Sequence, residues 1–350
     1  MRILIAGRIA ILAVFAAVSA FSQTAERKIV IQSLDEHYDW AITPERLQDY
    51  RAASQDVRIV VARTPQEFER EIVDADAVIG GISKDLFAKA KKLKWLQSYS
   101  AGVEAYRWPE FVESDVILTN CKIVQGPNIA DHAFAMLLAL TRGLHVFIPG
   151  RSKEEWIRDG PSVPPLDELP GKTVVIIGMG GIGTQLAQRA QGFGMTVIGV
   201  DPKDIPYMAS VRKIVSPNEL DSVLPEADVV FVAAPYTPQT ERMMAEAQFN
   251  LMKTGSYFIA VSRGGLYDTS ALVKALDSRK LAGAGLDVTN PEPLPKGHPL
   301  WTMPNVILTP HVAGTSPGAQ ERRAEVVRDN ILRFVHNQPL RNVVDKRKGY

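Results

Sequence analysis

Short apolar runs alternate with amphipathic stretches over the first hundred residues after position 27. The runs are typical of buried strands, and the stretches between them have apolar positions at helical spacing. The predicted strands are Lys28–Gln32, Val57–Ala62, Ala77–Ile79, Leu93–Gln97 and Val116–Thr119, and the predicted helices are Pro44–Ala53 and Pro65–Val73. Such alternation indicates a parallel sheet that is covered on both faces.

A second alternating unit begins at residue 173. Its predicted strands are Thr173–Gly178, Thr196–Val200, Val229–Val232, Ser256–Val261, Ala282–Asp287 and Val306–Leu308. Between the two units we predict a long helix from Asn128 to Phe147, capped by Asn128, and a proline-rich loop from Gly150 to Gly171. An amphipathic helix, Gln320–His336, follows the second unit. The pattern predicts an α/β protein with two doubly wound parallel-sheet domains.

Composition and charge exclude several classes of protein to which the chain could otherwise belong. The 350 residues are 46% hydrophobic, with 40 Lys and Arg against 39 Asp and Glu. This apolar content supports large cores and excludes disorder, and a net charge of +1 gives no basic field for nucleic acid. The single cysteine, Cys121, allows no internal disulfide and no cysteine-based zinc site. We predict no metal site and no nucleic-acid partner.

The N-terminus has the pattern of a signal peptide. Arg2 and Arg8 accompany an apolar run from Ile9 to Val18, too short to span a bilayer of about 30 Å. We predict that residues 1–22 are a signal peptide, and that the protein is exported or periplasmic. A misassigned start codon or an apolar N-terminal strand is the alternative, and the protein is then cytoplasmic. No other segment reaches 18 apolar residues, so no membrane span is predicted in the mature chain.

A glycine-rich turn follows the first strand of the second unit. The run Thr173–Ile177 leads into the G-x-G-x-x-G pattern of Gly178, Gly180 and Gly183, and a helical segment comes next. Gly178 permits the tight turn, Gly180 lets the backbone approach a pyrophosphate, and Gly183 lets the helix pack on the strand. The helix N-terminus offers free N–H groups to the phosphates. Strand, turn and helix in this order predict a dinucleotide-binding site.

Asp201 bears on which dinucleotide binds. It ends the strand that follows the glycine loop, 18 residues after Gly183, where an acidic side chain binds the ribose hydroxyls. A carboxylate at this position repels a 2′-phosphate. The sequence therefore favours NAD over NADP, although Lys203 lies close by.

Polar residues follow three strands of the second unit. Arg263 comes after Ser256–Val261, Asp287 ends its strand with Glu292 five residues on, and His311 follows Val306–Leu308. Ligands of parallel α/β sheets bind at the carboxyl ends of strands, so these side chains are expected in one crevice. A histidine paired with a carboxylate is an oriented acid/base group, and an arginine clamps a carboxylate. The set suits hydride transfer coupled to proton transfer.

With these motifs the chain resembles the D-isomer-specific 2-hydroxyacid dehydrogenase family, which includes phosphoglycerate dehydrogenases and glyoxylate/hydroxypyruvate reductases. The resemblance covers Lys28 to the C-terminus. Its matching segments, in the family's order, are Ser100–Glu104, Asn128–Ala133, the glycine loop with Asp201, Ser262–Gly265, Gly285–Val288 with Glu292, and Thr309–Gly314.

The resemblance implies a role for each candidate catalytic residue. His311 is the expected general acid/base, and Glu292 holds its imidazole and favours the protonated form. Arg263 is expected to bind the carboxylate of a 2-keto acid and to polarise its carbonyl. The substrate-binding backbone N–H groups are expected from Ala101, Gly102 and Val103 on the other domain.

The resemblance also implies cofactor contacts and an architecture. The expected cofactor-binding residues are Gly178, Gly180, Gly181, Ile182, Gly183, Asp201, Ala234, Val261, Ser262 and Asp287, the last on the nicotinamide carboxamide. A flavodoxin-like substrate domain is expected at 26–125 and 316–350, and a Rossmann NAD-binding domain at 126–315. A homodimer is expected. The implied reaction interconverts a small 2-keto acid and a D-2-hydroxy acid with NAD(H); an NADPH-preferring reductase and a non-catalytic NAD-sensing protein are the alternatives.

Overall fold

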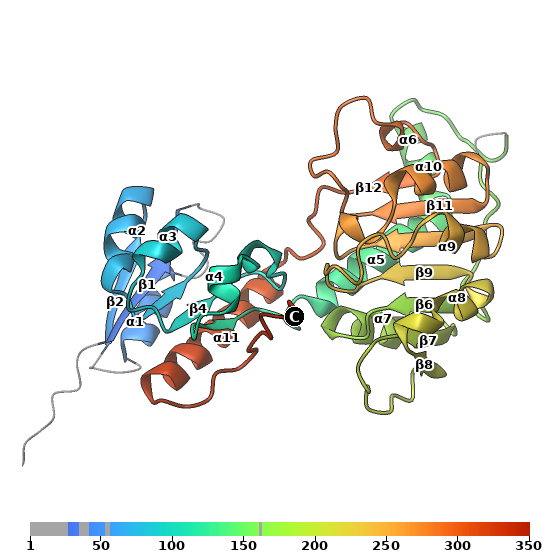
Figure 1. Cartoon of the computed structure of the whole chain (residues 1–350). Helices are drawn as coiled ribbons and strands as arrows, with labels where there is room; N and C mark the ends of the chain where they lie inside the picture. The colour runs from blue at the N-terminus through green and yellow to red at the C-terminus, as the bar shows by residue number, and fades with distance from the viewer. Residues whose placement is uncertain (1–26, 35–41, 53–56, 161–162) are drawn as a thin grey trace, which may run out of the picture.

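The computed structural model describes residues 27–34, 42–52, 57–160 and 163–350, which form two lobes side by side (Figure 1). The predicted signal peptide, residues 1–22, lies outside the described residues. That segment and the export inferred from it stay predictions.

The first lobe is built on five parallel strands in the order β2-β1-β3-β4-β5. The strands are β1 (Arg27–Gln32), β2 (Val57–Ala62), β3 (Ala77–Ile79), β4 (Trp95–Gln97) and β5 (Ile117–Thr119). The helices are α1 (Pro44–Ala52), α2 (Pro65–Glu71), α3 (Lys84–Lys89), α4 (Pro109–Val112) and, from the far end of the chain, α11 (Pro317–Val335). This strand order is that of flavodoxin-like sheets, with the chain winding first one way and then the other.

Helix α11 completes the core of the first lobe. Its apolar face, with Val327 and Ile331 fully buried, packs against Ile29 and Ile31 of β1 and Trp95 of β4. Figure 1 shows this helix, in red, beside the blue and cyan elements of the first lobe. Helix α11 thus covers a sheet whose last strand ends at Thr119, 198 positions before Pro317.

The second lobe carries seven parallel strands in the order β12-β11-β10-β9-β6-β7-β8. The strands are β6 (Thr173–Ile177), β7 (Thr196–Val200), β8 (Lys213–Val215), β9 (Val229–Val232), β10 (Ser256–Ala260), β11 (Leu281–Leu286) and β12 (Val306–Leu308). The helices are α5 (Gly126–Thr141), α6 (Leu144–Arg151), α7 (Gly181–Gly192), α8 (Leu220–Val223), α9 (Glu246–Leu251) and α10 (Thr269–Asp277). The strand order reverses between β6 and β9, which is where doubly wound sheets bind ligands. The prediction of two doubly wound parallel-sheet domains is confirmed.

The helix predicted from Asn128 to Phe147 is wrong in its extent. The structure has two helices, α5 and α6, that break at Gly143, whose φ of +68° is left-handed and suits glycine. Asn128 is not the cap: α5 begins at Gly126, and the Asn128 amide donates to the carbonyl of Ala313 at 2.7 Å. Among the described residues no single helix is long and apolar enough to cross a membrane, and α5 with α6 passes only as a pair bent by 79°.

Other elements differ from expectation mainly at their ends. Helix α11 begins three residues earlier than predicted, because Ser316 caps it by accepting from Ala319 N and Pro317 occupies the first turn. Strand β8 was not predicted. It is a three-residue edge strand with no fully buried residue, so it has no continuous apolar run to mark it.

Candidate active site

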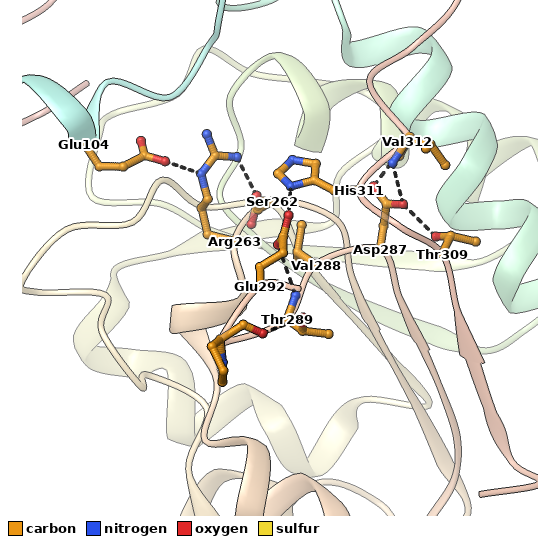
Figure 2. A network of polar contacts seen from close by, with 12 residues as sticks. Glu104, Ser262, Arg263, Asp287, Val288, Thr289, Glu292, Thr309, His311 and Val312 are labelled. Carbon is orange, nitrogen blue, oxygen red and sulfur yellow. Dashed lines mark hydrogen bonds and ion pairs between the residues drawn. The ribbon is translucent and has the colours of Figure 1, made fainter. Parts of the chain in front are cut away.

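The polar residues predicted at strand ends lie at one edge of the second sheet. Arg263 follows β10, Asp287 follows β11 and His311 follows β12, and these three strands are neighbours. Because all run in parallel, their carboxyl ends meet at the same edge. Figure 2 shows the side chains gathered there, with Glu292 reaching in from the segment after β11.

His311 and Glu292 form a direct pair. The imidazole Nδ1 lies 2.6 Å from Glu292 Oε1, and both side chains are 42% exposed. With Nδ1 engaged by the carboxylate, the ring is oriented and Nε2 is the nitrogen left for a substrate oxygen. His311 has a φ of +53°, unusual for a residue with a side chain, so the surrounding loop must hold it in place.

Asp287 provides that hold. Its buried carboxylate accepts hydrogen bonds from Val312 N and Ala313 N, each at 3.0 Å, and from the Thr309 hydroxyl at 2.6 Å. Its own carbonyl accepts from His311 N at 2.9 Å. The side chain therefore fixes the loop that carries His311 on both sides. Its expected contact with a nicotinamide carboxamide stays a prediction, and a carboxylate with about four acceptor sites has room for one more donor.

Arg263 lies across from the first lobe. Its Nη1 donates to the Ser262 carbonyl at 2.7 Å, and its Nε donates to the carboxylate of Glu104, which follows β4 (Figure 2). Its Nη2 lies directly against Gly102, where any Cβ would overlap it. The structure thus brings Arg263 to the Ala101–Val103 backbone that was predicted to bind the same carboxylate.

The glycine loop joins β6 to α7. Gly178 has a φ of +94°, and a Cβ there would stand 2.6 Å from the Ala234 backbone nitrogen, so glycine is required. A Cβ at Gly180 meets nothing within 4 Å, which leaves open space over the loop. Helix α7 starts at Gly181 with no side-chain cap, so the N–H groups of its first turn are available to phosphate oxygens. These features fit a bound dinucleotide pyrophosphate.

The other predicted cofactor residues line the same end of the sheet. Ala234, Val261 and Ser262 are buried at the ends of β9 and β10, and Ile182 is half-buried in the first turn of α7. Asp201 follows β7, and its two carboxylate oxygens accept from Met179 N at 2.8 Å and Lys203 N at 2.9 Å. The carboxylate is therefore held beside the glycine loop, at the position expected for a ribose contact.

The site also contains two polar residues that the sequence motifs did not predict there. His132 of α5 places Nε2 2.8 Å from the Thr309 hydroxyl, behind the loop that carries His311. Glu104 of the first lobe binds Arg263. Both lie inside segments that carry the family resemblance, but nothing in the local sequence says which neighbours they meet.

Tyr267 supports the segment that carries Glu292. Its hydroxyl donates to the Val288 carbonyl at 2.7 Å inside the core. Burial, and to a smaller extent the charge of Glu292, raises the pKa of Tyr267. The hydroxyl therefore stays protonated and keeps donating over the working range of most enzymes.

Comparison with known proteins defines the class. Residues 134–313 match the family model for the NAD-binding domain of D-isomer specific 2-hydroxyacid dehydrogenases. A glyoxylate reductase from Thermococcus gammatolerans is 32% identical over 332 residues, which covers 90% of this chain and 92% of that protein. A D-3-phosphoglycerate dehydrogenase from Methanocaldococcus jannaschii is 31% identical over 294 residues, although the match spans only 55% of that longer protein. The chain belongs to the D-isomer specific 2-hydroxyacid dehydrogenase family.

Solved structures agree with this assignment. A family member from Aeromonas salmonicida superposes with a TM-score of 0.78 at 31% identity, over 92% of this chain and 99% of that one. An NADPH-dependent glyoxylate/hydroxypyruvate reductase from Sinorhizobium meliloti, solved with NADP and sulfate, superposes with a TM-score of 0.76 at 28% identity. The match covers 93% of this chain and 100% of that one. The protein is thus an oxidoreductase of the class that acts on CH–OH donors with a nicotinamide cofactor.

Proposed function

We propose that the protein interconverts a small 2-keto acid and the corresponding D-2-hydroxy acid, with NADH as the preferred reductant. One observation carries the proposal: the His311–Glu292 pair and the Arg263 guanidinium lie at the same sheet edge as the glycine loop with its open space at Gly180. An acid/base group, an anion clamp and a dinucleotide cradle together are what this reaction needs.

In the proposed reduction, different residues of the chain bind the substrate and transfer the proton. Arg263 Nη2 and the neighbouring backbone N–H groups of Gly102 and Val103 bind the substrate carboxylate and orient the keto group. When bound, the nicotinamide supplies the hydride that the carbonyl carbon accepts. His311 Nε2 gives its proton to the carbonyl oxygen as negative charge develops there, and Glu292 holds the ring through Nδ1. In the reverse direction His311 removes the hydroxyl proton.

The substrate class follows from the clamp and from the relatives. Proteins named glyoxylate reductase match most of this chain, and the Sinorhizobium relative is a glyoxylate/hydroxypyruvate reductase. The direct test is steady-state assay of glyoxylate, hydroxypyruvate and pyruvate with NADH and with NADPH. We expect turnover of at least one of them. If no 2-keto acid in a broad panel is reduced with either cofactor, the proposed function is wrong.

Asp201 gives the proposal of NADH over NADPH its physical basis. Its carboxylate is fixed beside the glycine loop and repels a 2′-phosphate. We expect Asp201→Asn to lower the ratio of kcat/KM with NADH to kcat/KM with NADPH by about 10-fold or more, the size of one charge-assisted hydrogen bond. Asp221→Asn, an exposed acid on α8, is the matched control. A wild-type ratio below one would instead support the NADPH-preferring alternative, which the Sinorhizobium relative illustrates.

We also propose a homodimer formed through the second lobe. Residues 144–158 expose large apolar side chains, among them Trp156 at 94% and Ile148 at 65%. The same segment has an open hollow of about 440 Å³ lined by Phe147, Trp156, Ile157 and Arg158. A patch of this kind marks an interaction surface. A second copy of the chain is the proposed partner, in keeping with the family.

The proposed dimer can be tested by size-exclusion chromatography with light scattering, which measures the molar mass of the protein in solution. We expect wild type to have the mass of two chains and Trp156→Glu to have the mass of one, because a buried unpaired carboxylate opposes association. Tyr207→Glu is the matched control, since Tyr207 is 91% exposed on the same lobe outside this patch. A monomeric wild type, or a Trp156→Glu variant that stays dimeric, contradicts the proposal.

A further inference from the structure

The Arg263 guanidinium already holds a carboxylate from its own chain. Glu104, on the first lobe, accepts from Arg263 Nε on the second lobe, and both side chains are partly exposed, at 38% and 27%. Figure 2 shows the two side chains pointing toward each other. The ion pair therefore bridges the two lobes inside the site proposed for substrate.

This carboxylate lies directly beside the proposed carboxylate site, on Nε of the same guanidinium. A Cβ built on Gly102 would stand 2.5 Å from Glu104 Oε2 and would overlap Arg263 Nη2. Glu104 thus places one oxygen on the guanidinium and the other beside the Gly102 backbone. Those are the two groups that are expected to bind a 2-keto acid.

We propose that Glu104 is an internal competitor for the substrate carboxylate: it occupies the Arg263–Gly102 anion site when no substrate is bound, and an incoming 2-keto acid must displace it. This inference rests on the proposed function, because it concerns the anion site of that reaction. It makes Glu104 a residue that sets the affinity for substrate. Competition follows from charge, because one guanidinium that serves two carboxylates brings two negative groups together.

Glutamine at position 104 separates competition from simple orientation of Arg263. Glu104→Gln has nearly the same shape and can still accept from Nε, but it carries no charge to compete with an anion. We expect it to lower the KM for the 2-keto acid by about 2- to 10-fold, the range of a partly exposed ion pair, with no accompanying fall in kcat. Glu104→Ala should shift KM in the same direction.

Binding of an inert anion provides a readout that does not need turnover. Oxalate, a dianion, and oxamate, a monoanion of similar size, are titrated calorimetrically into the full chain. We expect Glu104→Gln to bind oxalate more tightly than wild type, and to gain more for oxalate than for oxamate. Glu110→Gln is the control for a lost charge on the same lobe, since Glu110 pairs with Lys84 on the exposed surface, and it should match wild type.

The outcomes are exclusive. A lower KM and tighter oxalate binding in Glu104→Gln support the competitor. An unchanged or higher KM with unchanged or weaker oxalate binding overturns it and makes Glu104 a group that merely orients Arg263. Should wild type reduce no 2-keto acid at all, the proposed function fails while the oxalate titration still decides the inference.

Discussion

We expect His311→Asn to lower kcat for 2-keto acid reduction by about 10²- to 10⁴-fold, with little change in KM. Asparagine can occupy the space beside Glu292 but has no proton to give at neutral pH. The loss therefore falls on the step in which the carbonyl oxygen is protonated. Stopped-flow measurement of NADH consumption, at saturating substrate, reports it directly.

A structural defect must be separated from this chemical one. His336→Asn makes the same substitution at an exposed histidine just after α11, and should retain wild-type kcat. The Kd of His311→Asn for NADH, measured by fluorescence, should stay within about twofold of wild type, because the pyrophosphate cradle is distant in sequence and built on other strands. A His311→Asn variant with more than a tenth of wild-type kcat would remove His311 from the acid/base role.

Arg263→Lys has the second-largest expected effect. A lysine retains the positive charge, but it lacks the planar fork with which the guanidinium binds a carboxylate through two parallel N–H groups while Nη1 donates to the Ser262 carbonyl. Losing one or two charge-assisted hydrogen bonds lowers kcat/KM by about 10²-fold or more. Most of the loss should appear as a higher KM, because the clamp acts on the ground state as well as on the transition state.

The matched control for this variant is Arg212→Lys. Arg212 pairs with Glu226 on the exposed side of the second lobe, and its replacement should leave kcat/KM unchanged. An Arg263→Lys variant with kcat/KM within about threefold of wild type would contradict the clamp. Glyoxylate is the best substrate for the comparison, since it has almost no side chain to contribute other contacts.

The fold was largely predictable because its strands are buried on both faces. Such strands are short continuous apolar runs, and their order in the sequence is enough to imply parallel sheets. Local features that depend on tertiary contacts were not predictable. Gly143 splits the expected helix although apolar residues continue on both sides of it, and Asn128 looks like a cap but bonds to Ala313, 185 residues away.

In the candidate site, too, some features could be predicted from the sequence and others could not. Arg263, Asp287 and His311 could be placed together from sequence, because the ends of neighbouring parallel strands must meet. The contact of Glu104 with Arg263 could not, since it joins residues 159 positions apart on different lobes. The role of Asp287 in holding the His311 loop could not be predicted either. Its carboxylate accepts from backbone N–H groups, which are present at almost every position and therefore leave no sequence motif.

Helix α11 follows the whole second sheet in the sequence, and this affects when the first lobe can complete its fold during synthesis. During translation the first sheet emerges early, yet Ile29, Ile31 and Trp95 lie on a face that α1 covers only together with α11. The whole second sheet, from β6 to β12, is synthesised before α11 exists. A nascent first lobe therefore has part of an apolar face uncovered until α11 leaves the ribosome, and by then all seven strands of the second lobe have been synthesised.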